Sequence, residues 1–235
     1  PLFIKFIMAP AYLVTGTDKE VGKTTVAAGL LHAARLLGLS TAAAKPVASG
    51  CVKTEQGLRN DDALALLAQC SLPLRYEEVN PQAFEPAIAP HLAAREAGVV
   101  LDVTSLYQPV REVLDRGADF SLVEGAGGWR VPLSGTQTLS DLAIALGLPV
   151  ILVVGVRLGC INHAVLTAEA IACDGLQLAG WVANIVEPQT SRLEDNLATL
   201  AERLPAPCLG HVPRLESARA DAVSACLDLG RLPGW

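Results

Sequence analysis

Positive charge and aromatic side chains are both scarce in this sequence. The 18 Lys and Arg residues are outnumbered by 24 Asp and Glu residues, so the formal net charge is −6, and aromatic residues make up 4% of the chain. Nucleic-acid backbones are bound through clustered Lys and Arg, so no nucleic acid is expected as the main partner. The tryptophans, Trp129, Trp181 and Trp235, fit packing roles better than a base-stacking platform. The negative net charge does not argue against a small phosphorylated ligand, because such a ligand needs only a few positive groups at its binding site.

The sequence also lacks paired cysteines. No C-x-x-C pair and no Cys/His spacing typical of a zinc site occurs. We therefore expect free thiols, buried or half-buried, in a protein of the reducing cytoplasm. The cysteines concerned are Cys51, Cys70, Cys160, Cys173, Cys208 and Cys226.

Long hydrophobic runs are absent as well. The longest nearly uncharged stretch, residues 142–156, spans about 15 residues and is interrupted by Gly147 and Pro149, which is too short to cross a bilayer. No membrane segment is expected. Residues 1–7 precede the single methionine, Met8, and are too short for a signal peptide. We expect them to be an extension that lies outside the fold.

The remaining sequence alternates between strand and helix patterns. With 235 residues and 51% hydrophobic residues, it suits a single α/β domain over residues 1–235. The alternation predicts a P-loop NTPase-like fold, a mostly parallel sheet with helices on both faces and right-handed crossovers. Strands are expected at 11–14, 41–44, 119–123, 150–154, 178–186 and 207–209, and helices at 25–37, 61–70, 108–116, 138–146, 160–174 and 189–204.

Two stretches carry neither pattern. Residues 53–60 are polar and contain glycine, so they are expected to form a loop. Residues 71–103 contain four prolines and are expected to be irregular. Because a loop of this length inside a compact domain usually serves binding or acts as a lid, the second stretch is a candidate for either role.

The first predicted strand runs into a loop that ends in Gly22-Lys23-Thr24, directly before a long helix. Backbone N–H groups and the helix N-terminus offer positive charge to phosphate, Lys23 can reach the β/γ-phosphates, and the Thr24 hydroxyl can bind Mg²⁺. The match to G-x-x-x-x-G-K-[ST] is imperfect, because five residues separate Gly16 from Gly22 and Thr17 occupies the position of the first glycine. A chance Gly-Lys-Thr in a turn is the alternative, and the flanking strand and helix disfavour it.

Charged residues follow other predicted strands. Pro46 keeps Lys45 out of helical geometry, so Lys45 is expected at the carboxyl end of a strand, where ligands bind in open α/β sheets. Glu124 ends a buried strand and is followed by glycines that allow close approach to a metal-bound phosphate. Asp61 and Asp62 begin a helix, where acids are also favoured by the helix dipole without any ligand.

The Lys23-Thr24 loop, Lys45 and Glu124, which all follow predicted strands, are expected to converge on one crevice. Two lysines, a hydroxyl and carboxylates around phosphate are what Mg²⁺-assisted phosphoryl transfer needs. No nucleophilic triad is indicated, because Ser49 has no patterned histidine beside it. The four histidines are His32, His91, His163 and His211, and His32 is interpreted as structural.

Several motif blocks in order along the chain closely resemble the dethiobiotin synthetase family. They are Gly-Thr-Asp-Lys-Glu-Val-Gly-Lys-Thr at 16–24, Lys-Pro-Val-Ala-Ser-Gly at 45–50, Gly-Leu-Arg-Asn-Asp-Asp-Ala at 57–63, Val-Glu-Gly-Ala-Gly-Gly-Trp at 123–129, Val-Ile-Leu-Val-Val-Gly at 150–155, Gly-Cys-Ile-Asn-His at 159–163 and Gly-Trp-Val-Ala-Asn at 180–184.

The resemblance implies an ATP- and Mg²⁺-dependent carboxylation with ring closure. The substrates would be 7,8-diaminononanoate, CO₂ and ATP, and the products dethiobiotin, ADP and phosphate. One amine would add CO₂ to form a carbamate, which would attack the γ-phosphate to give a carbamic-phosphoric anhydride. The second amine would then displace phosphate, so the protein would contribute positioning and charge rather than a nucleophile.

The resemblance also implies residue roles. Thr24, Asp62 and Glu124 would hold Mg²⁺, Lys23 and Lys45 would neutralise phosphate and carbamate oxygens, and Ser49 would bind the carbamate. The nucleotide would be bound by Glu20, Val21, Gly22, Lys23, Thr24 and Thr25, with Asn184 reading the adenine edge and Pro213 packing nearby. Gly159, Cys160, Ile161 and Asn162 would receive the substrate carboxylate, from the second subunit of a homodimer.

One residue departs from the family pattern, and one rival function stays open. Lys19 stands where the family has a small hydroxyl residue, and residues after Pro213 match poorly. The rival is a dimeric regulatory P-loop ATPase of the partitioning or iron-protein type. Its signature lysine should fall at position 18, which is Asp18 here, and Lys19 is one residue out of register.

Overall fold

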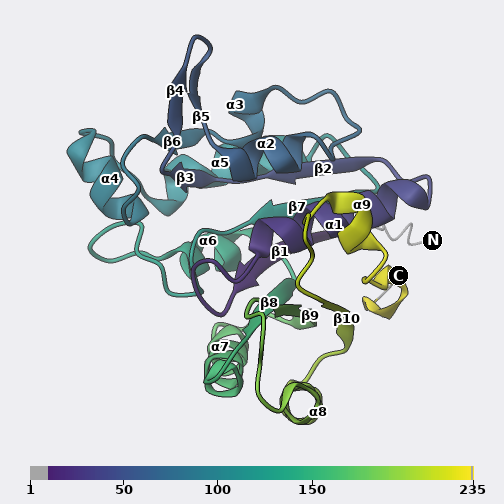
Figure 1. Ribbon diagram of the computed structural model, residues 1–235. Coiled ribbons are helices and arrows are strands. Elements are labelled where there is room, and N and C mark those ends of the chain that lie inside the picture. The colour runs from purple at the N-terminus through teal and green to yellow at the C-terminus, as the bar shows by residue number, and fades with distance from the viewer. Residues whose placement is uncertain (1–9, 234) are drawn as a thin grey trace, which may run out of the picture.

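The computed structural model describes residues 10–233 and 235, so the predicted extension at residues 1–7 lies outside the described residues. Its centre is a six-stranded sheet in which every pairing is parallel (Figure 1). From one edge the strands are β10 (Cys208–Val212), β9 (Leu178–Ile185), β8 (Val150–Val156), β1 (Ala11–Gly16), β7 (Phe120–Glu124) and β2 (Thr41–Ala44). The predicted α/β fold with a parallel sheet is confirmed. That the chain forms one domain stays a prediction.

The strands form where short runs of apolar residues can be buried on both sides. All seven residues of β8 and all five of β7 are buried, including the acidic Glu124 at the end of β7. Continuous burial of this kind needs helices on both faces of the sheet, and β-branched residues favour the extended backbone. Because all six strands run in the same direction, their carboxyl ends lie at one shared edge of the sheet.

Helices cover the two faces as predicted (Figure 1). Gly29 lets α1 approach α9, because a Cβ at this position would lie 2.5 Å from the side chain of Val223. One face is covered by α1 (Lys23–Leu36), α2 (Asp61–Leu67), α9 (Ala220–Ser224) and the 3-10 helix η1 (Leu229–Arg231). The other face is covered by α5 (Val103–Leu114), α6 (Leu139–Leu146), α7 (Cys160–Cys173) and α8 (Leu193–Arg203).

The prediction that residues 71–103 form one long irregular loop is wrong. The stretch contains α3 (Tyr76–Val79), β6 (Gln82–Phe84) and α4 (Pro90–Glu96), and β6 pairs in parallel with β3 (Val47–Ser49). Its prolines flank these elements or begin them, as at the first turn of α4, where proline needs no backbone donor. The segment therefore packs against the domain instead of forming a free loop.

Other boundaries also differ from the expectations. Residues 53–60 are largely a hairpin of β4 (Val52–Thr54) and β5 (Gly57–Arg59) rather than a loop. The helix α5 begins five residues earlier than expected, because Asp102 and Ser105 cap its N-terminus reciprocally. The helix α8 begins four residues later, after Arg192 in a left-handed conformation.

Predicted packing residues are found where expected. Trp181 is fully buried, Trp129 is buried with its indole N–H donating to Asp174, and Trp235 packs edge-on against Phe120. All six cysteines are free thiols. Within the part of the chain that the structure describes, no helix has both the length and the apolar character needed to span a membrane.

Candidate functional site

A cavity of about 590 Å³ opens at the carboxyl edge of the central sheet. Four segments line it: the loop after β1 with the start of α1, residues 45–49, residues 87–90 and the glycine-rich turn at 126–131. Asn60 and Asp62 add polar groups from the start of α2. The walls are therefore charged on the P-loop side and largely apolar at residues 87–90.

The P-loop joins β1 to α1 and is held in a specific shape. Gly22 begins α1 in the left-handed region with φ of 85°, and a Cβ here would lie 2.1 Å from Nδ2 of Asn184. The Asn184 side chain donates a hydrogen bond of 2.9 Å to the carbonyl of Val21. Lys23 turns back over the loop, where its Nζ donates to the carbonyl of Asp18 at 2.9 Å. Only glycine combines this φ with this close approach.

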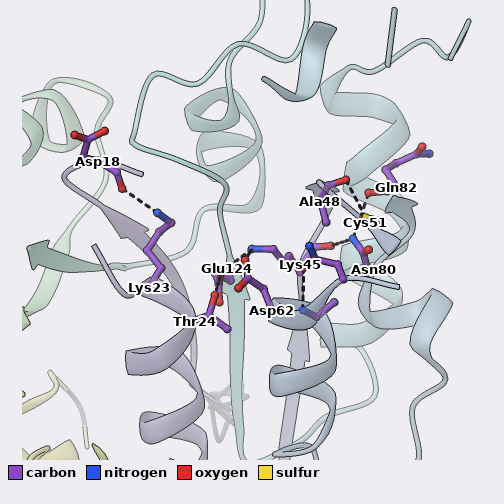
Figure 2. Close-up of polar contacts among 12 residues, drawn as sticks. Asp18, Lys23, Thr24, Lys45, Ala48, Cys51, Asp62, Asn80, Gln82 and Glu124 are labelled. Carbon is purple, nitrogen blue, oxygen red and sulfur yellow. Dashed lines mark hydrogen bonds and ion pairs between the residues drawn. The ribbon is translucent and has the colours of Figure 1, made fainter. Parts of the chain in front are cut away.

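A buried charged cluster lies beside the P-loop (Figure 2). Lys45 follows β2 and Glu124 ends β7, and the Lys45 Nζ lies 2.6 Å from the Glu124 Oε1. The Thr24 hydroxyl donates to the same oxygen at 2.7 Å, and Asp62 lies 3.2 Å from the Lys45 Nζ. The structure thus brings together Thr24, Lys45 and Glu124, which the sequence predicted for one crevice, and Asp62, which the family resemblance implied.

The two lysines of the site have opposite electrostatic environments. Burial lowers the pKa of Lys45, but the Glu124 and Asp62 carboxylates outweigh that effect, so the net pKa is raised. Burial also lowers the pKa of Lys23, and the nearby Lys45 charge lowers it further, so the net pKa of Lys23 falls despite the Glu124 carboxylate. Lys45 is therefore held as a cation by its carboxylate partners.

The donor set fits a hard divalent cation. Glu124 does not itself line the cavity, but its Oε2 atom is buried without a hydrogen-bond partner among the described residues, next to the lining residues Thr24 and Lys45. Thr24 and Asp62 add a hydroxyl and a second, half-exposed carboxylate on the same side of the cavity. Mg²⁺ typically takes one or two carboxylates together with phosphate oxygens and water. Among the described residues, no group of three or more His, Cys, Asp and Glu could hold a metal alone.

Other predicted residues lie at the cavity or at its edge. Ser49 lines the cavity, as do Glu20 and Thr25, whereas the Val21 side chain is buried under the loop. Asn184 pairs in register with Val212 across β9 and β10, so the exposed Pro213 follows directly beside it. Neither residue lines the cavity, although Asn184 contacts the P-loop through Val21.

The segment Gly159 to Asn162 does not line the cavity of its own chain. It forms the N-terminus of α7, where Gly159 has φ of 90° and Cys160 is buried. The preceding Leu158 is 96% exposed, so this turn projects an apolar side chain into solvent. The segment therefore lies apart from the P-loop and the Lys45–Glu124 cluster of its own chain.

Sequence reasoning missed some residues of the site. Asn60, not Asp61 or Asp62, is the N-cap of α2, and its side chain accepts from the N–H of Ala63 at 3.2 Å. Its position directly before an acidic helix start was an available signal. Arg157 lies 2.8 Å from the Asp18 carboxylate, and no local pattern links residues 139 positions apart.

Comparisons with known proteins identify the family and the fold of the chain. A family model described as an AAA domain matches residues 10–222. An ATP-dependent dethiobiotin synthetase of Pseudomonas paraeruginosa is 76% identical over 94% of this chain and 96% of its own, and one of Cellvibrio japonicus is 63% identical over 93% and 96%. The septum site-determining protein MinD of Pyrococcus horikoshii, solved with Mg-ADP, shares the fold at a TM-score of 0.56 and 15% identity, over 96% of this chain and 90% of that chain. The chain belongs to the ATP-dependent dethiobiotin synthetase family.

Proposed function

We propose that this chain converts 7,8-diaminononanoate, CO₂ and ATP to dethiobiotin, ADP and phosphate. The observation that carries the proposal is a charged cluster in a chain 76% identical to a dethiobiotin synthetase. Lys23, Thr24, Lys45 and Asp62 line one cavity, and the fully buried Glu124 contacts both Thr24 and Lys45. The substrate amines are the nucleophiles, so no side-chain nucleophile is needed. The six free thiols support a cytoplasmic location.

Thr24 and Asp62, which line the cavity, and Glu124, which is buried beside Thr24, would hold Mg²⁺, with the unpartnered Glu124 Oε2 as one ligand. When bound, this ion would supply positive charge that balances the negative charge on the phosphate oxygens. The Thr24 hydroxyl now donates to Glu124, and its oxygen lone pairs stay available to a cation. The buried position of Glu124 would keep water away from this charge.

ATP would lie along the P-loop. The backbone N–H groups from Glu20 to Thr25 would cradle its phosphates at the N-terminus of α1. Lys23 would leave the Asp18 carbonyl for the phosphate oxygens, exchanging a neutral acceptor for a charged one. At the other end of the nucleotide, the Asn184 carbonyl oxygen would accept from the adenine amino group, with Pro213 packing beside it.

Lys45 and Ser49 would handle the carbamate. One substrate amine attacks CO₂ and loses a proton to form the carbamate, whose oxygen then attacks the γ-phosphorus and releases ADP. Lys45 would balance the charge that develops on the carbamate and phosphoryl oxygens, and the Ser49 hydroxyl would donate to the carbamate. The second amine attacks the carbonyl carbon, the carbon–oxygen bond to phosphate breaks, and the urea ring closes.

The carboxylate tail of the substrate would be bound by a second copy of the chain. In each cavity, Gly159, Cys160, Ile161 and Asn162 would come from the partner of a homodimer. The N-terminus of α7 has no side-chain cap, and helix N-termini of this kind favour a carboxylate. The placement of this segment outside its own cavity and the exposed Leu158 support the arrangement.

The first test follows phosphate release from ATP with Mg²⁺ and bicarbonate, with and without 7,8-diaminononanoate, and identifies the organic product by mass. The proposal requires release that depends on the diamine and a product heavier by one carbonyl and lighter by two hydrogens. Hydrolysis that is indifferent to diamine and bicarbonate would overturn it and favour the regulatory ATPase that the sequence left as a rival.

Subunit mixing tests the shared site. Lys45→Ala inactivates the phosphate side of a cavity, and Asn162→Ala impairs the tail side that serves the partner. In a symmetric dimer, a pair made of one chain of each variant contains one intact site and one site with both changes. Because random pairing also produces unmixed, inactive dimers, co-refolded variants should recover about one quarter of the wild-type activity. Activity no higher than the sum of the separate variants would exclude sites built from two chains.

A further inference from the structure

Residues 76–80 pack directly beneath Lys45, although the sequence suggested a loop there. The Asn80 side chain is 3% exposed, and its Nδ2 donates to the carbonyl of Lys45 at 2.8 Å (Figure 2). The N–H of Lys45 donates to the carbonyl of Val79 at 2.7 Å. Both backbone polar groups of Lys45 are therefore satisfied by this one segment.

Tyr76 extends the contact toward α2. Its buried hydroxyl donates to Asn80 Oδ1 at 3.0 Å and accepts from the backbone N–H of Asn60 at 2.8 Å. Asn60 is the N-cap of α2, the helix whose first turn carries Asp62. A continuous chain of hydrogen bonds thus runs from the start of α2 through two side chains to the backbone of Lys45.

The outer face of Tyr76 is also covered. The Arg59 guanidinium lies 4.2 Å from the centre of the tyrosine ring, and it pairs with Glu77 at 3.0 Å. A ring fixed between a cation and the domain has little freedom to turn its hydroxyl elsewhere. The chain of hydrogen bonds is consequently held from outside as well as at both ends.

We propose that Tyr76 and Asn80 are positioning residues that hold Lys45 and Asp62 in register across the metal and phosphate site. The inference rests on the proposed function for the roles of Lys45 and Asp62. Positioning is needed because Lys45 and Asp62 come from separate elements, and Asp62 is half-exposed on a helix of seven residues. A misplacement of about 1 Å in such a site can lower the rate about 100-fold.

The test compares Tyr76→Phe with Tyr107→Phe. Tyr107 lies on α5, is half-buried and has no side-chain hydrogen bond among the described residues. We expect Tyr76→Phe to lower kcat about 10- to 100-fold and to raise the Mg²⁺ concentration for half-maximal binding of adenylyl imidodiphosphate about tenfold. Tyr107→Phe should change neither quantity. The melting temperature of each variant is measured to show that it is folded.

A double-mutant cycle separates positioning from simple stability. If Tyr76 acts through Asp62, the Mg²⁺ dependence of Tyr76→Phe combined with Asp62→Asn should be no worse than that of Asp62→Asn alone. Additive effects would overturn the inference that Tyr76 positions Asp62. A Tyr76→Phe variant that melts at a lower temperature but keeps its kcat and its Mg²⁺ dependence would do the same.

The nucleotide-binding readout distinguishes the two proposals, because it needs no diamine. Wild-type protein that makes no dethiobiotin would refute the proposed function. If Tyr76→Phe still weakened Mg²⁺-dependent nucleotide binding in that protein, the positioning role would stand for a site of another activity. Unchanged binding together with normal dethiobiotin synthesis would refute the positioning role alone.

Discussion

Lys45 and Glu124 form an ion pair of 2.6 Å in which the two side chains are 4% and 0% exposed. Charges buried this deeply are held only with their partners, because the cost of desolvation is met by direct attraction and hydrogen bonds. The pair therefore ties the end of β2 to the end of β7. It also presets the positive and negative groups that the proposed reaction requires.

Lys45→Ala should abolish turnover and also reduce stability. Removal of the cation leaves the Glu124 carboxylate buried and uncompensated, so the free energy of unfolding should fall by about 3–5 kcal/mol. Urea denaturation measures the loss of unfolding free energy, and turnover and nucleotide affinity are measured on the folded protein. Lys53→Ala, at an exposed site of the hairpin, is the control and should change neither property. Wild-type stability in Lys45→Ala would contradict the paired arrangement.

Glu124→Gln should weaken the response to Mg²⁺, and it should also lower stability because the buried Lys45 ammonium loses its nearest carboxylate. The amide keeps the shape of the carboxylate and can still accept from the Thr24 hydroxyl, but it removes a charged ligand. We expect about a tenfold higher Mg²⁺ concentration for half-maximal nucleotide binding. Glu112→Gln on the exposed side of α5 serves as the control. An unchanged metal titration would exclude Glu124 as a ligand.

Gly22→Ala should impair the P-loop itself. The added Cβ would meet the amide of Asn184 at 2.1 Å and would force alanine into a left-handed backbone with φ of 85°. A cost of about 1–3 kcal/mol corresponds to roughly a 5- to 150-fold loss of ATP affinity, measured by calorimetry. Gly117→Ala is matched for backbone, with φ of 72°, but meets nothing within 4 Å. Its ATP affinity should equal that of the wild type, and equal losses in both variants would contradict the role of the clash.

Cys70 should resist thiol modification in the folded protein. Burial raises the pKa of its thiol to about 11, so at pH 8 the reactive thiolate is about 100-fold less abundant than for an ordinary cysteine. Its labelling by iodoacetamide should be slow at pH 8 and should rise about tenfold per pH unit toward the pKa. Cys173 is exposed and provides a fast internal comparison by peptide mapping. Equal labelling of both at pH 8 would show that Cys70 is not protected.

The order of strands and helices followed from the sequence, because it depends on local properties. Apolar runs of five to seven residues, glycines with positive φ and first-turn capping groups act over a few positions. The P-loop and the charged residues at the ends of β2 and β7 could be predicted for the same reason, because they are also recognised from a few neighbouring positions. Residues 71–103 could not be predicted in this way. Elements as short as α3 and β6 have little stability alone and form because tertiary contacts hold them.

What only the tertiary structure decided is which distant residues meet. Thr24 and Glu124 are 100 positions apart, and Lys45 is 79 positions from Glu124. Thr24 and Lys45 nevertheless both donate to the same carboxylate oxygen of Glu124. Parallel pairing of β1, β7 and β2 sets this arrangement, since neighbouring strands end at the same edge. The sequence alone determined that a P-loop, a lysine and an acid would each follow a strand. The tertiary structure determined that the P-loop, the lysine and the acid form one site, through the register of those strands and the packing of Tyr76 and Asn80 between Lys45 and α2. Hydrogen bonds and ion pairs depend on distances that no local pattern specifies.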